Sequence, residues 1–256
     1  MTRLSDGWVL AAAFGVVAGL ANVVGGWLAV GRQGWDRVRQ SYFVAAGAGF
    51  MLAAVFLRMV PESYRLVAAH GGAPLGVGTL ILVGYLIVHA AEHVLVGHFH
   101  FGEETHREHW VEPVVGTTAL IGLLLHTLFD GVSIGSGFLI RPSLGILIAI
   151  AIILHKVPEG FTVGSIMVAA GRSRREAVMS AAWLGIATVV GVVTISFWSG
   201  LVVYALPLSA GAALYVAASD LIPAVNEAKG IGMALGVFGG VLLFYISESI
   251  LGSLGL

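Results

Sequence analysis

Two histidine–carboxylate pairs stand inside the most apolar part of this sequence. His126 and Asp130 belong to the stretch HTLFDG, and His155 and Glu159 belong to the stretch HKVPEG. Each histidine precedes its carboxylate by one helical turn, so in a helix the two side chains share a face. Imidazole together with carboxylate suits a divalent transition metal, zinc foremost and iron or manganese as alternatives. The four residues therefore predict a metal site built by two neighbouring segments.

The segments that carry these pairs must be membrane-spanning helices. The 256-residue chain is 58% hydrophobic and only 11% charged, whereas a soluble domain carries about 25% charged residues. A helix needs about 20 apolar residues to span the hydrocarbon. We predict an all-α polytopic membrane protein, with residues 1–256 forming a single transmembrane domain. The eight predicted helices are approximately 7–31, 41–61, 74–96, 114–139, 143–170, 176–199, 205–225 and 231–252.

The fourth and fifth helices should bring the two pairs together. The short turn at Arg141–Pro142 makes these helices antiparallel neighbours. His126 and His155 each lie roughly 18 Å from the membrane surface, near its middle. His126 is then expected beside Glu159, and Asp130 beside His155. Ionisable groups at this depth are costly and usually functional.

Charge and composition set the surroundings. Arginine and lysine are more frequent after the first, third, fifth and seventh helices, which predicts cytoplasmic loops there and both termini outside. The loop 97–113 is then cytoplasmic, and its histidines, among them His98 and His100, form either a solvated loop or a loose metal-binding tract. A net charge of −1 gives no support for a nucleic-acid partner, and the lack of cysteine excludes a thiolate site. The compact chain favours a bacterial inner membrane.

The second and seventh predicted helices end in similar short sequences. The second ends LRMVPES and the seventh ends SDLIPAV, and each places a charged residue three positions before a proline. With the predicted orientation the two helices run in opposite directions. This is the trace that an inverted repeat would leave.

The motifs resemble those of the ZIP family of divalent-metal transporters, in its bacterial form. The similar stretches are HTLFDGVSIG (126–135), HKVPEG (155–160), GFMLAAVFLRMVPES (49–63) and AGAALYVAASDLIPA (210–224). The resemblance implies a 3+2+3 bundle, in which helices 1–3 and 6–8 are inverted repeats around helices 4 and 5. It implies metal transport toward the cytoplasm by alternating, elevator-like access, without a prosthetic group. The ion would be Zn²⁺, with Fe²⁺, Mn²⁺ and Cd²⁺ as alternatives, and a homodimer fits the family.

By position, the resemblance assigns His126, His155 and Glu159 to the primary site and places Asp130 beside it. Met51 matches a helix-2 methionine near that site in some bacterial relatives; the alternative is plain core packing. A thioether is a soft ligand that would favour zinc or cadmium over manganese.

The sequence departs from the family where a second metal would bind. Lys156 replaces a bridging carboxylate, Thr127 replaces an asparagine, and Thr188 aligns with a helix-6 glutamate. Arg58 stands where many members have histidine. Because Lys156 flanks the face of His155, we expect its ammonium to pair with Asp130 or Glu159. The hypothesis is a mononuclear site with a built-in cation in place of the second metal.

The remaining polar residues leave alternatives open. His89 and His93 form either an exit-side relay or an interfacial pair, and Asp220 would shape the pathway. One rival function is a ZIP-like protein that binds metal without transporting it. Another is an intramembrane metal-dependent hydrolase, but the chain contains no HExxH motif and has Lys156 where a general base would stand. We therefore do not expect an enzyme.

Overall fold

Helices make up every regular element of the part of the chain that the structure describes. A computed structural model describes residues 2–31, 37–93, 113–227 and 230–255. Within these ranges eight helical stretches are long and apolar enough to cross a membrane. The predicted all-α architecture with eight spans is confirmed.

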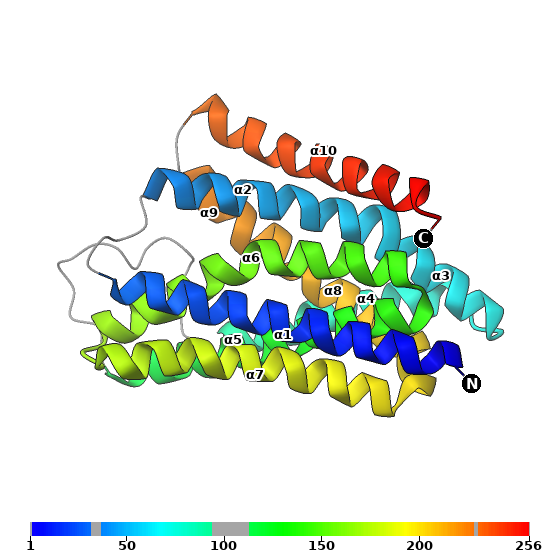
Figure 1. Cartoon of the computed structure of the whole chain (residues 1–256), viewed down its shortest axis with the longest axis horizontal. Coiled ribbons are helices and arrows are strands. Elements are labelled where there is room, and N and C mark those ends of the chain that lie inside the picture. The colour runs from blue at the N-terminus through cyan, green and yellow to red at the C-terminus, as the bar shows by residue number, and fades with distance from the viewer. Residues whose placement is uncertain (1, 32–36, 94–112, 228–229, 256) are drawn as a thin grey trace.

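The spans run alternately up and down the bundle (Figure 1). The single-helix spans are α1 (Thr2–Val30), α4 (Pro74–Ala91), α5 (Pro113–Ile140), α6 (Pro142–Ala169), α7 (Arg174–Phe197) and α10 (Ile231–Ser253). The second span comprises α2 (Arg37–Ala54), the π-helical segment η1 (Val55–Met59) and α3 (Val60–Ala69). The seventh comprises η4 (Ser199–Leu201), α8 (Val202–Tyr215), the π-helical segment η5 (Val216–Leu221) and α9 (Ile222–Glu227). Because α1 begins and α10 ends at the same end of the bundle, we call it the terminal end.

The second span is longer than the sequence predicted. The expected end at residue 61 is wrong, because the helix continues to Ala69. Pro61 lies in the first turn of α3, where the missing backbone donor of proline is tolerated. The helix ends at Ala69, and Gly71, two residues later, turns the chain with a φ of 75° that suits glycine. Gly171, also at φ 75°, ends α6 in the same way.

The two halves of the chain repeat the same helix crossings. The second span packs on α10 at Gly49, where an added Cβ would lie 1.9 Å from the carbonyl oxygen of Val237. The seventh span packs on α4 at Gly211, where an added Cβ would lie 1.9 Å from the carbonyl oxygen of Ile81. Such glycines let helix backbones touch. The crossing of spans two and eight therefore has a counterpart in the crossing of spans seven and three, as an inverted repeat requires.

The central helices follow the same symmetry. On α5, a Cβ at Gly131 would lie 2.0 Å from the carbonyl oxygen of Thr188 in α7. On α6, a Cβ at Gly160 would lie 2.0 Å from the carbonyl oxygen of Asn22 in α1. Thus α5 packs closely on α7 as α6 packs on α1. These contacts match the 3+2+3 arrangement that the resemblance implied, and they hold α5 and α6 at the centre.

We predict that Gly240→Ala destabilises the bundle while Gly239→Ala does not. A Cβ at Gly240 would lie 2.0 Å from the carbonyl oxygen of Ala46, whereas a Cβ at Gly239 meets nothing within 4 Å. Overpacking of this kind costs about 1–3 kcal/mol. Thermal unfolding in detergent should show a clearly lower Tm for Gly240→Ala alone. Equal Tm values for the two neighbours would contradict the close crossing.

Candidate metal site

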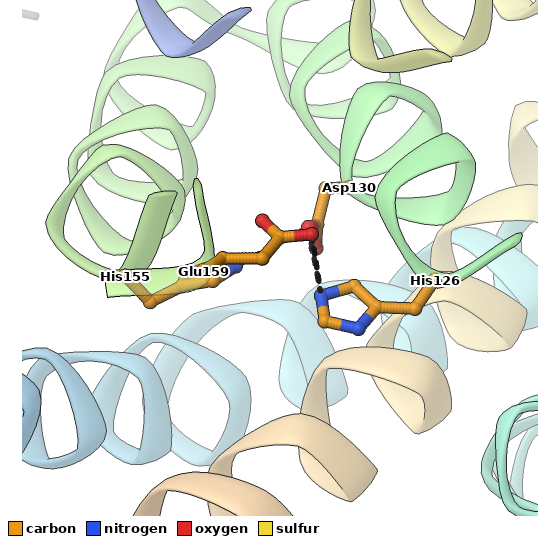
Figure 2. Close-up of side chains that lie close together, drawn as sticks. All are labelled: His126, Asp130, His155 and Glu159. Carbon is orange, nitrogen blue, oxygen red and sulfur yellow. Dashed lines mark hydrogen bonds and ion pairs between the residues drawn. The ribbon is translucent and has the colours of Figure 1, made fainter. Parts of the chain in front are cut away.

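The two histidine–carboxylate pairs meet between α5 and α6 in the interior of the bundle. His126, Asp130, His155 and Glu159 are all buried, and each offers a ligand atom within 4.8 Å of the others. Figure 2 shows the four side chains pointing toward one another. The antiparallel hairpin turns at Arg141, just before Pro142 begins α6. The predicted convergence is confirmed, and the role of these residues as metal ligands stays a prediction.

The imidazole of His126 lies close to two carboxylates of the cluster without forming a hydrogen bond among the described residues. His155 Nε2 lies 3.2 Å from Asp130 Oδ2. His126 Nε2 lies 3.3 Å from Asp130 Oδ2 and 3.9 Å from Glu159 Oε1. Among the described residues, neither ring nitrogen of His126 has a hydrogen-bond partner in acceptable geometry. A buried polar atom without a partner is uncommon and calls for an explanation, and a metal ion bound between imidazole and carboxylate would supply one.

Lys156 is fully buried beside the same carboxylates. Its Nζ lies 2.6 Å from Asp130 Oδ2, forms an ion pair with Glu159 Oε2, and donates to Thr127 Oγ1 at 3.3 Å. Thr127 Oγ1 in turn donates to Glu159 Oε1 at 2.5 Å. The predicted pairing of Lys156 is confirmed, and it involves both acids. Thr127 belongs to this network, and its predicted place at a second-metal position stays a prediction.

Asn22 is a polar neighbour that the sequence reasoning missed. It is fully buried in α1. The amide orientation that satisfies its neighbours places the side-chain nitrogen 2.7 Å from the Lys156 carbonyl oxygen and 3.3 Å from Glu159 Oε2. The close crossing of α1 and α6 at Gly160 brings it there. A lone asparagine in an otherwise apolar span was the available signal.

A second group of possible ligands shares His126. The Nδ1 atom of His126 lies 4.0 Å from Oε1 of Glu92, the residue that directly follows α4. Together with Asp220 of η5, these two residues form a group whose ligand atoms lie within 4.8 Å of one another. Asp220 is buried, and its Oδ2 has no hydrogen-bond partner among the described residues. His126 thus stands between two carboxylate pairs. The sequence reasoning had named Asp220 for the pathway but had missed Glu92.

Two further candidates lie in the interior without reaching the four-residue cluster through any described hydrogen bond or ion pair. Met51 is buried in the main hydrophobic core. Thr188 is fully buried and donates its hydroxyl to the Leu184 carbonyl oxygen, at 3.4 Å on its own helix. Core packing accounts for the position of Met51. Its proposed role as a soft ligand stays a prediction.

The histidines near the end of α4 lie side by side with their rings tilted by 37°. The rings of His89 and His93 lie 4.0 Å apart, and His93 Nδ1 is 3.0 Å from the His89 carbonyl oxygen. His89 also lies against Tyr215 in an edge-to-face contact. His98 and His100, with most of the loop 97–113, lie outside the described residues.

Comparison with known proteins agrees with this geometry. The family model described as ZIP Zinc transporter matches residues 102–248. This range includes Asp220 and the four residues His126, Asp130, His155 and Glu159, called the core cluster or core site below. This match covers more than half of the chain. No curated protein matches the sequence. Members of that family transport divalent metals. The eight apolar helices and the buried histidine–carboxylate cluster are consistent with this function. The chain belongs to the ZIP zinc transporter family.

Proposed function

We propose that this protein carries a divalent transition metal, zinc foremost, through a mononuclear site formed by His126, Asp130, His155 and Glu159. The observation that carries the proposal is the buried imidazole of His126, which lies between two carboxylates and forms no hydrogen bond in acceptable geometry among the described residues. Nitrogen and oxygen donors suit Zn²⁺, and they also accept Fe²⁺ or Mn²⁺. Cd²⁺ would gain most if Met51 also acts as a ligand. The metal is the cargo, and no prosthetic group is needed.

The number of ions follows from the charge of the cluster. Asp130 and Glu159 bring two negative charges, and Lys156 brings one positive charge within contact of both. One dication is attracted to this group. With two acids and one ammonium the cluster has one net negative charge, so one dication already makes it net positive and a second dication would be repelled. Lys156 therefore takes the place of a second metal.

The second ligand group gives the ion a next position. Because His126 belongs to both groups, with Nε2 toward Asp130 and Glu159 and Nδ1 toward Glu92, an ion released from the first group meets the second group at the other nitrogen of the same ring. With the termini outside, Glu92 lies on the cytoplasmic side, and His89 and His93, three residues before it and one after it, would form a relay toward the loop 97–113. An elevator-like shift of the central helices α5 and α6 would alternate access. The setting would be a bacterial inner membrane, with a homodimer as the assembly.

One observation favours a second function. Lys156 contacts both acidic ligands of the core cluster, so it could hold the site closed to passing ions. The protein would then bind metal as a sensor or structural subunit without moving it. The two functions differ in flux, not in binding.

We predict that purified protein in liposomes takes up Zn²⁺ and that His126→Ala lowers the initial rate at least tenfold. His126 is the residue common to both ligand groups. Thr79→Ala is the matched control, because the Thr79 hydroxyl donates only to the Leu75 carbonyl oxygen on its own helix. Zn²⁺ binding without flux in the unmodified protein would favour the sensor function. Equal flux in His126→Ala would contradict the proposed site.

We predict one tight Zn²⁺ per chain when the histidines of the loop 97–113 are replaced by alanine. The variant Lys156→Glu in this background should bind two, because it removes the ammonium and adds a third carboxylate. Lys156→Met should still bind one, since it adds no ligand. The measurement is a calorimetric titration with metal analysis. Two tight ions in the Lys156 protein would contradict the mononuclear site.

We predict that Asn22→Leu weakens Zn²⁺ binding 10–100-fold. The reason is that the Asn22 amide orients Glu159, and removing a group that orients a metal ligand usually has an effect of about this size. Ser196→Ala is the control, because the Ser196 hydroxyl donates to the Val192 carbonyl oxygen on its own helix. Competition with a zinc-sensitive dye measures both variants. Unchanged affinity in Asn22→Leu would show that Asn22 only packs.

A further inference from the structure

An ion pair joins the second span to α10 in the half of the bundle nearer the terminal end. Arg58 of η1 pairs with Glu248 of α10, and the two side chains are 32% and 28% exposed. They line a cavity of about 100 Å³ together with Arg141 and Ser143. The proposed transport cycle does not use this pair.

The inverted repeat gives Arg58 a counterpart in Asp220. Arg58 lies in the π-helical segment η1, three residues before Pro61. Asp220 lies in the π-helical segment η5, three residues before Pro223. Both segments lie between two α-helices of their span, and each directly follows the α-helix that packs on the partner span. The two side chains therefore hold equivalent positions in the two halves.

Glu248 has a counterpart in Glu92 by the same reasoning. Gly240 of α10 packs against the second span, and Gly84 of α4 packs against the seventh span. Glu248 follows Gly240 by the same number of residues as Glu92 follows Gly84. The Arg58–Glu248 pair is therefore the second copy of the Glu92–Asp220 pair.

The two copies differ in charge. Glu92 and Asp220 are both acids, and among the described residues no lysine or arginine forms an ion pair with either of them. Asp220 Oδ2 is buried and lacks a hydrogen-bond partner in that part of the chain. In the other copy, Arg58 holds the residue position of Asp220, and its longer side chain carries a guanidinium that pairs with Glu248. Arginine stays charged in proteins, so this copy carries its own cation permanently.

We propose that Arg58 acts as a built-in cation: its guanidinium fills the position that a divalent cation would take in the terminal-end copy of the Glu92–Asp220 arrangement. Cation binding outside the core site is thereby restricted to the copy at the opposite end. Arg58 is a specificity-determining residue in this role, since it decides which of two equivalent positions can hold a metal. The inference rests on the proposed function only in taking Glu92 and Asp220 to bind cations.

The test asks whether removing the guanidinium and adding an acid creates a cation site. The background carries His126→Ala, which disables both ligand groups described above, and Arg141→Gln, which removes the second guanidinium of the cavity. In this background Arg58→Asp reproduces the acidic copy, and Arg58→Gln is the matched control. The probe is Mn²⁺, a metal suited to carboxylate ligands, whose free ion is counted by electron paramagnetic resonance.

We expect the Arg58→Asp protein to bind one more Mn²⁺ per chain than the Arg58→Gln protein, at least tenfold more tightly than any site in the control. Equal Mn²⁺ binding by two folded, monodisperse variants would overturn the proposal. Because His126 is absent from both proteins, the result does not depend on Zn²⁺ flux. Failure of the proposed transport function would appear in the liposome assay instead.

The reciprocal change covers the case in which Arg58→Asp does not fold. Asp220→Arg should pair with Glu92 as Arg58 pairs with Glu248. In a His155→Ala background, which weakens the core site equally in both proteins, Asp220→Arg should lower the Mn²⁺-induced rise in Tm further than Asp220→Asn does. Equal Mn²⁺ responses of the two variants would overturn the equivalence of the two positions.

Discussion

The ion pairs of Lys156 with Asp130 and Glu159 place a fully buried cation in the middle of an apolar bundle. A lysine at the centre of a membrane helix costs about 2.5–3.5 kcal/mol even on the most lenient scale. Two carboxylates offset that cost here, and the same carboxylates are the acids that a metal would need. The cluster therefore carries its own cation, and the imidazole of His126 beside it forms no hydrogen bond in acceptable geometry among the described residues. In the proposed function, Lys156 limits the positive charge that the cluster can accept.

Close helix crossings make this cluster possible. Gly131 and Gly160 let α7 and α1 press against the two central helices, so α5 and α6 meet at the depth of the four ligands. The crossing at Gly160 also delivers the amide of Asn22 to Glu159. Since the two halves of the chain make equivalent crossings, they create equivalent polar positions. The charges at those positions then differ, because Glu92 and Asp220 are both acids whereas Arg58 pairs with Glu248.

The sequence predicted those parts of the site that depend on spacing within a helix. The one-turn spacing of His126 and Asp130, and of His155 and Glu159, was enough to predict their convergence across a short turn. The approach of Lys156 followed from its place beside His155. Asn22 and Glu92 could not be found this way, because each reaches the site through contacts between distant spans. The π-helical segments were also missed, so Pro61 was taken as the end of a helix that continues beyond it.

The central claim is that one ion binds and that an ammonium stands where a second ion would be. Zinc K-edge X-ray absorption on protein lacking the loop histidines would test it most directly. A single zinc site should show a shell of nitrogen and oxygen ligands at about 2.0–2.2 Å and no metal–metal scattering. A zinc–zinc distance of about 3.5–4 Å, as in two-metal sites, would contradict the account.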